Sequence, residues 1–82
     1  MRIELSLYAS LQGYLPEGPP GSSGKRSRIV ELPDTITVGE LAARLGLPDQ
    51  PRISFMDGRA VTDHVALHDG TRLAIFPPVA GG

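Results

Sequence analysis

No cysteine occurs in this chain of 82 residues. Disulfide bonds, thiolate metal sites and cysteine nucleophiles are therefore excluded together. No apolar run is long enough to span a lipid bilayer, and Glu4 stands where a secretory signal would begin its apolar stretch. The formal net charge is only −1 and both signs are scattered, so we expect no binding surface for nucleic acid or an anionic membrane. These absences predict a cytoplasmic protein with neither kind of partner.

The chain is also too short to build the walls of a deep catalytic pocket. Its 82 residues allow one domain with one modest core. Hydrophobic residues make up 40% of the chain, which suits a folded domain and argues against global disorder. This length favours a carrier or binding module over an enzyme.

The N-terminal part predicts two strands separated by a loop. Residues 2–8 alternate strictly between polar and apolar side chains, which is typical of a strand that buries one face. The side chains on that buried face are Ile3, Leu5 and Leu7. Segment 18–27 is rich in glycine, proline and serine, so we expect a loop without regular structure there. A second strand is predicted at about 27–32, where Pro33 closes it.

One short helix is specified by local signals at both of its ends. Thr37 is a good N-cap, and Glu40 three residues later completes a capping box. Ile36 can meet Leu41 across the first turn as a hydrophobic staple, and Gly46 ends the helix. The apolar residues at helical spacing are Val38, Leu41, Ala42 and Leu45. They form one stripe, so the helix has one face to bury.

The C-terminal part predicts a hairpin and a final strand. Asp57-Gly58 is a strong tight-turn signal between segments 53–56 and 59–61. Segment 71–76 alternates so that Leu73 and Ile75 share one face. The whole order predicts an α+β fold, with one helix packed on one face of a mixed four- to five-stranded sheet.

Three side chains of these strands should lie on the sheet face away from the helix: Tyr8, Ala74 and Phe76. An aromatic patch beside the end of the last strand would be a reasonable surface for docking a partner. We therefore predict that partner proteins dock on these residues.

The last six residues form an extended tail: Pro77, Pro78, Val79, Ala80, Gly81 and Gly82. Proline cannot donate a hydrogen bond to a sheet, so strand pairing should end at Phe76. We therefore divide the chain into a folded domain at 1–76 and a tail at 77–82. Fully extended, the tail reaches about 20 Å, and two glycines can pass through a channel that larger residues would block.

The tail and residues 67–71, together with the order of elements, resemble the MoaD/ThiS family of ubiquitin-like, β-grasp sulfur carriers. The Phe-Pro-Pro sequence that leads to Gly-Gly is more similar to the MoaD branch. The resemblance implies that a MoeB/ThiF-type enzyme adenylates the Gly82 carboxylate, using ATP and magnesium. It also implies that the resulting thiocarboxylate delivers sulfur to an acceptor such as the large subunit of molybdopterin synthase. The chain itself is then expected to bind no cofactor.

Three alternatives remain open. The chain resembles the ThiS branch, which supplies sulfur for the thiazole of thiamin, less closely. A ubiquitin-like modifier that is conjugated through Gly82 would share the activation step. A plain β-grasp interaction module would have an inert tail. MoaD-type chains commonly follow the first strand with a Phe-Ala-x-x-Arg-Glu segment, whereas this chain has no Arg-Glu there.

Two further patterns are interpreted as ordinary surface. His64 and His68 are four residues apart, but turn signals around Gly70 argue against a helix that presents both, and two histidines rarely hold a metal. The glycines and cations of segment 18–28 lack the Gly-Lys-Ser/Thr order that binds phosphate. We therefore predict no metal site and no nucleotide site.

Overall fold

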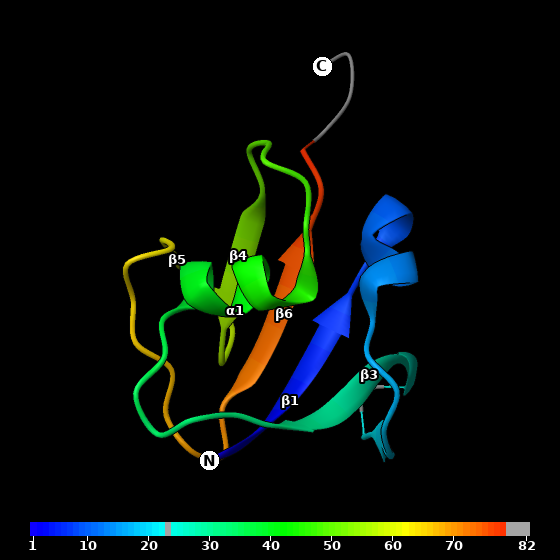
Figure 1. Ribbon diagram of the computed structural model, residues 1–82. Helices are drawn as coiled ribbons and strands as arrows, with labels where there is room; N and C mark the ends of the chain where they lie inside the picture. The colour runs from blue at the N-terminus through cyan, green and yellow to red at the C-terminus, as the bar shows by residue number, and fades with distance from the viewer. Residues whose placement is uncertain (23, 79–82) are drawn as a thin grey trace.

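The computed structural model describes residues 1–22 and 24–78 of the chain. Its elements, in chain order, are β1 (Arg2–Leu7), the 3-10 helix η1 (Ala9–Tyr14), β2 (Pro20–Gly21), β3 (Gly24–Glu31), α1 (Val38–Leu45), β4 (Ile53–Met56), β5 (Arg59–Val61) and β6 (Arg72–Phe76). The strands form one sheet in the order β2-β3-β1-β6-β4-β5, and α1 lies across one face of it (Figure 1). The predicted α+β fold, with one helix on one face of a mixed sheet, is confirmed.

The centre of the sheet is a parallel pair made of β1 and β6. Leu5 lies beside Leu73 and Leu7 beside Ile75, while every other strand pair is antiparallel. Both central strands run toward the same end of the molecule, which is the upper end in Figure 1. The first and last strands of the domain therefore finish side by side.

Helix α1 begins and ends as its sequence predicts. The Thr37 hydroxyl accepts from the Glu40 N–H (3.1 Å), and the Glu40 carboxylate accepts from the Thr37 N–H (3.0 Å). This capping box satisfies two backbone donors that the first turn would otherwise leave unpaired. Gly46 follows the helix with φ of 76°, a left-handed conformation that glycine adopts without strain.

The core lies between α1 and the sheet face that it covers. Val38 and Leu41 of the helix are buried against side chains of the two central strands, and Leu45 is only partly buried at the margin. The buried core residues of the strands are Ile3, Leu5, Leu7, Leu73 and Ile75. Ile36, which precedes α1, is also buried in the core, and Leu11 of η1 and Leu67 of the loop before β6 complete it. These two residues had no place in the predicted elements.

The prediction for segment 18–27 is wrong in part. Pro20–Gly21 forms strand β2, and β3 begins at Gly24 rather than near residue 27. Gly21 pairs with Gly24 across the sharp turn between them, and Pro20 pairs with Arg28. Backbone pairing along the sheet edge thus overrides the poor strand propensity of glycine and proline. The sheet consequently has six strands, rather than four to five.

The hairpin of β2 and β3 also covers part of the sheet face opposite α1. A Cβ atom at Gly21 would lie 2.7 Å from Cγ of Glu4 and 2.7 Å from Oγ of Ser27, so any side chain there would force one of them to move. Ser6 lies opposite Ser27 on this face, and both are buried. The outer face, defined here as the sheet face away from α1, is therefore open mainly over β4 and β6.

No helix in residues 1–22 and 24–78 is long and apolar enough to cross a membrane.

Leu41→Ala tests the packing of α1 on the sheet. Leu41 is buried in the centre of the core, so the substitution should lower the free energy of unfolding by about 2–5 kcal/mol. Urea denaturation measures this loss. Arg44→Ala, at an exposed position of the same helix, should change stability by only about 0.5 kcal/mol or less. Equal effects of the two substitutions would contradict the packing described here.

Candidate functional site

Tyr8, Ala74 and Phe76 lie on the outer face, near the end of the central strand pair. Along β6, Leu73 and Ile75 are buried in the core, and the residues between and after them point to the opposite face. Tyr8 follows β1 directly, and its N–H donates to the Ile75 carbonyl (3.2 Å). This hydrogen bond extends the pairing of the two central strands by one residue beyond β1, close to the end of β6.

These residues join side chains of β4 in a cluster that we call the aromatic patch: Tyr8, Ile53, Phe55 and Phe76. The Tyr8 and Phe76 rings stack with centroids 4.3 Å apart and planes 9° apart. Phe55 meets Phe76 edge to face, with centroids 5.8 Å apart and planes 89° apart. Ile53 lies opposite Phe76 in the sheet and remains 42% exposed. Each of the three rings thus contacts a neighbouring ring in a favourable geometry, and the patch is apolar.

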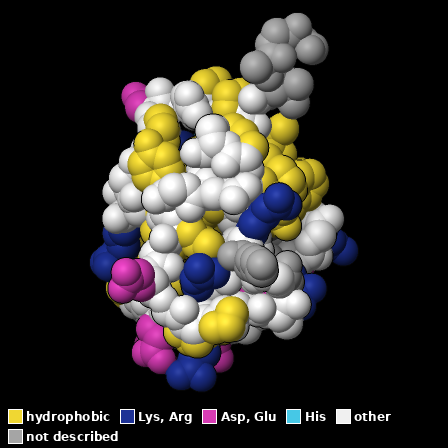
Figure 2. All heavy atoms as spheres, turned by 90° about the vertical axis from the view of Figure 1, so that its right-hand side faces the viewer, with side chains coloured by type: hydrophobic (Ala, Val, Ile, Leu, Met, Phe, Trp, Pro, Cys, Tyr) yellow, Lys and Arg dark blue, Asp and Glu magenta, His cyan; other side chains and the backbone are white. Residues whose placement is uncertain are grey.

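The aromatic patch continues into the first residues of the tail. A groove of about 450 Å³ lies between the rings and the chain that leaves the sheet. Its lining residues are Ala9, Ile53, Phe55, Phe76, Pro77 and Pro78. In Figure 2, hydrophobic side chains gather mainly in the upper half of the view, toward the end where β6 finishes in Figure 1. A contiguous exposed apolar surface of this kind is typical of a site where another protein binds.

The last strand pair, Ile53 with Phe76, is the point at which the tail separates from the sheet. Pro77 and Pro78 follow outside regular structure. Four residues to which the sequence analysis assigned the reactive end and its arm lie outside the described residues: Val79, Ala80, Gly81 and Gly82. The predicted roles of the tail and of the docking residues thus stay predictions.

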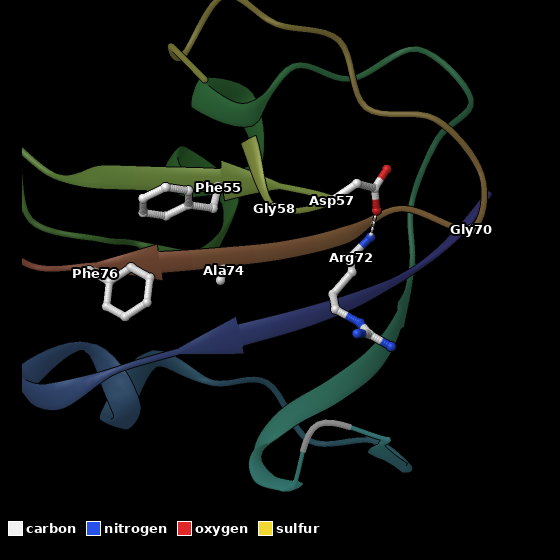
Figure 3. Close-up of a pocket in the computed structure, with 7 residues that line it drawn as sticks. All are labelled: Phe55, Asp57, Gly58, Gly70, Arg72, Ala74 and Phe76. Carbon is white, nitrogen blue, oxygen red and sulfur yellow. Dashed lines mark hydrogen bonds between the residues drawn. The ribbon is translucent and has the colours of Figure 1, made fainter. Parts of the chain in front are cut away.

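A second hollow, of about 650 Å³, extends along β6 away from the tail (Figure 3). Phe55, Ala74 and Phe76 form its apolar part. Charged and glycine residues close the other end: Asp57, Gly58, Gly70 and Arg72. Asp57 has φ of 52° and Gly58 has φ of 85°, as the predicted tight turn requires. This turn lets the Asp57 carboxylate accept the Arg72 backbone N–H (2.9 Å).

One exposed charged pair, Arg2 with Glu31, lies apart from the aromatic patch. Glu31 binds Arg2 through a 2.9 Å hydrogen bond, which lowers the pKa of the Glu31 carboxyl and raises the pKa of the Arg2 guanidinium. Both side chains are exposed at the far end of β1. Solvent screens such a pair, so it adds little to stability.

His64 and His68 occupy the loop between β5 and β6 rather than one helix face. His68 Nε2 lies 3.5 Å from the Asp57 carboxylate. Within the described part of the chain, no three His, Cys, Asp or Glu side chains are grouped so that they could hold a metal ion.

Phe55 and Ile53 are the members of the patch that the sequence analysis did not assign to it. The alternation of segment 53–56 shows that these two side chains share a face. The antiparallel register of β4 with β6 places that face with Phe76, and local sequence does not reveal which strands are neighbours.

Comparison with solved structures finds the same fold in archaeal and bacterial proteins. SAMP1 from Haloferax volcanii is 26% identical, with a TM-score of 0.65 and full coverage of both chains. The HVO 2177 protein of Haloferax volcanii is also 26% identical, with a TM-score of 0.75, over all of this chain and 87% of the other. Subunits 1 and 2 of the molybdopterin-converting factor from Helicobacter pylori form a protein–protein complex, and a chain of it matches with 16% identity, a TM-score of 0.58 and full coverage of both chains.

Among curated proteins, none matches this sequence. A sequence model of the ThiS family matches residues 21–82, which include β3, α1, the aromatic residues of β4 and β6, and the tail. The matched region is well over half of the 82 residues. Together with the β-grasp architecture, this match shows that the chain belongs to the ThiS family of ubiquitin-like proteins.

Proposed function

We propose that this protein is a sulfur carrier that acts as the substrate of partner enzymes and is not itself an enzyme. The observation that carries the proposal is the course of β6, which runs through the centre of the sheet and leads into Pro77 and Pro78 beside the aromatic patch. A partner that binds the patch would have the tail directed into it. Membership of the ThiS family supports the same conclusion.

The chemistry belongs to the Gly82 carboxylate. A free carboxylate is a poor acyl donor because its oxygen is a poor leaving group. In the proposed first step, a carboxylate oxygen attacks the α-phosphate of ATP, and magnesium pyrophosphate leaves. A hydrosulfide ion, supplied by the sulfur donor, then attacks the carbonyl carbon of the acyl-adenylate, AMP leaves with the former carboxylate oxygen, and the thioacid loses its proton. The product is a thiocarboxylate, which the chain can carry without a cysteine.

The body of the domain supplies docking and direction. The patch offers apolar surface whose rings are already fixed by stacking, so little side-chain entropy is lost when a partner binds. The core is separated from this surface by the sheet, since Leu73 and Ile75 face α1 while Ala74 and Phe76 face outward. Binding can therefore proceed without any change in the core.

Two kinds of partner follow from the proposal. A MoeB/ThiF-type enzyme would adenylate the tail with ATP and magnesium. The acceptor would be the large subunit of molybdopterin synthase, so the sulfur would enter the molybdenum or tungsten cofactor. The complex of two molybdopterin-converting factor subunits in Helicobacter pylori supports an arrangement of this second kind.

Conjugation to other proteins is the second candidate function. Haloferax volcanii SAMP1 favours this function. Its identity to this chain is 26%, compared with 16% for the Helicobacter pylori chain. Another structure of the same fold from Haloferax volcanii is described as small archaeal modifier protein 1. Sulfur supply to the thiamin thiazole is a third outcome within the same family. All three begin with adenylation of Gly82.

Intact mass spectrometry separates these functions. The chain is incubated with the activating enzyme, ATP, magnesium and a sulfur donor, with and without acceptor proteins. Exchange of one carboxylate oxygen for sulfur is the expected result for a carrier. Adducts to other proteins indicate a modifier, and an unchanged mass in every reaction rejects both functions.

Deletion of Gly82 tests the reactive end. It withdraws the carboxylate by one residue, about 3.5 Å, which misplaces it for attack on the α-phosphate. Adenylate formation, followed by pyrophosphate release, should fall by a factor of about 100 or more. The melting temperature should stay the same, because the deletion lies beyond the last paired residue, Phe76. Wild-type adenylation in the deletion variant would refute the role of Gly82.

Gly81→Val tests the width of the partner's channel. The substitution keeps the length of the tail and adds a branched side chain next to the reactive residue. We expect a loss of adenylation with an unaltered melting temperature. Ala80→Gly provides the matched control, because it removes side-chain bulk from the same tail and should preserve activity. A variant at residue 81 that reacts at the wild-type rate would show that the channel is wide.

Phe76→Asp tests the aromatic patch. A carboxylate in place of the ring removes the stacking with Tyr8 and puts a charge at the centre of the apolar surface. Affinity for the activating enzyme, measured by calorimetry, should fall by about tenfold or more. Tyr14→Asp is the control, because Tyr14 is exposed on η1 and lines neither hollow. If both variants bind like wild type while remaining folded, the patch is not the docking surface.

A further inference from the structure

Arg72 lies on the outer face at the end of β6 that is farther from the tail. Its Nη2 group donates to the Ser22 hydroxyl (3.4 Å), and that hydroxyl donates to Oε1 of Glu4 (2.8 Å). Nε of Arg72 lies 3.9 Å from the same carboxylate oxygen. The three residues come from β6, from the turn between β2 and β3, and from β1. The hairpin that covers part of the outer face thus also holds the Arg72 side chain.

The cluster shelters its negative charge and presents its positive charge. The Glu4 side chain is 11% exposed, whereas the Arg72 side chain is 61% exposed. A guanidinium has five N–H donors, and within residues 1–22 and 24–78 Nη1 of Arg72 makes no hydrogen bond. Figure 3 shows the guanidinium extending away from Asp57, whose Oδ1 atom already accepts the backbone N–H of Arg72. Donors remain available to a group from outside the chain.

Arg72 also borders the hollow that leads to the aromatic patch. Arg72, Ala74 and Phe76 are alternate residues of one strand, so they line the outer face at intervals of about 6.8 Å. Two ring faces and a methyl group make the floor of this hollow apolar, and the guanidinium stands at its end. The surface therefore combines an apolar seat with a hydrogen-bonding fork, carried by a residue whose Cα atom lies about 14 Å along the strand from that of Phe76.

We propose that Arg72 binds an Asp or Glu carboxylate of the activating enzyme, on a segment whose neighbouring apolar side chain occupies the hollow. A planar guanidinium with adjacent free donors matches the two oxygens of a carboxylate better than it matches other protein groups. Phe55 and Phe76 line both this hollow and the groove beside Pro77 and Pro78, so an enzyme that binds the aromatic patch while it holds Gly82 would border this hollow. The inference rests on the proposed function and adds the residue that selects among activating enzymes.

Prior positioning by Ser22 and Glu4 makes the contact selective. An arginine that is already held loses less side-chain freedom on binding than a free one. Removal of the Ser22 hydroxyl should therefore weaken binding less than removal of the Arg72 charge, while acting in the same direction. A partner with a basic side chain at this position would meet the guanidinium directly and be rejected.

The test measures adenylation kinetics and calorimetric affinity for the activating enzyme with full-length variants. Arg72→Glu should raise KM and Kd about tenfold or more with kcat unchanged, because the contact lies away from the reacting carboxylate. Arg72→Gln, which removes the charge without adding one beside Glu4, should give a smaller shift in the same direction. Arg44→Glu, on the helix that covers the other face, is the matched control and should leave both constants unaltered. Wild-type affinity should also fall with added salt more steeply than that of Arg72→Gln.

The outcomes separate this inference from the proposed function. Failure of the wild-type chain to be adenylated rejects the function and the inference together. Wild-type adenylation with unchanged KM and Kd in a folded Arg72→Gln variant overturns the inference alone. Loss confined to sulfur transfer to the acceptor, with activation intact, also overturns it. Restoration of Arg72→Glu binding by an acidic-to-basic substitution in the enzyme would establish the pair directly.

Discussion

In the parallel pairing of β1 with β6, Leu5 lies beside Leu73 and Leu7 beside Ile75. This pairing brings the first and last strands of the domain together at the centre of the sheet and points both toward one end. Tyr8 and Phe76 consequently stack, although 67 residues lie between them in the chain. A parallel pair requires a long crossover connection, and here that connection contains α1, which covers the core. One pairing thus sets the core, the aromatic patch and the exit of the tail.

Much of this architecture could be predicted from the sequence because its signals are local. Three of these signals depend only on residues within a few positions of one another. They are the capping box of Thr37 and Glu40, the C-terminal Gly46 of the helix and the Asp57-Gly58 turn. Alternation in β1 and β6 likewise separates Leu5 and Leu73, which face the core, from residues that face outward. Periodicity of this kind reports the environment of a single element, and it was sufficient for the fold class.

The remaining features depend on contacts between distant segments. Nothing near Gly21 in the sequence indicates that it lies on Glu4, and the low strand propensity of its neighbours predicted a loop instead. Phe55 joins Phe76 only through the register of β4 with β6. Arg72 gains its partners from two other segments, so its sequence context gave no sign of the cluster. A one-residue change of register would move each of these side chains to the other face.

The side chains on the two faces of the sheet are consequently under different structural constraints. On the covered face, Leu5, Leu73 and Leu41 must fit one another, so substitutions there change stability. On the outer face, Phe76 and Arg72 need only stay exposed to a partner. Their strand, β6, is held in place by Leu73 and Ile75, which are buried on the opposite face. Neighbouring residues of β6 therefore lie in two different environments, the core and the outer face, although they are adjacent in sequence. Under the proposed function, substitutions of Arg72 or of residues 20–22 would alter partner binding while the same core is kept, because none of these residues contributes a side chain to it.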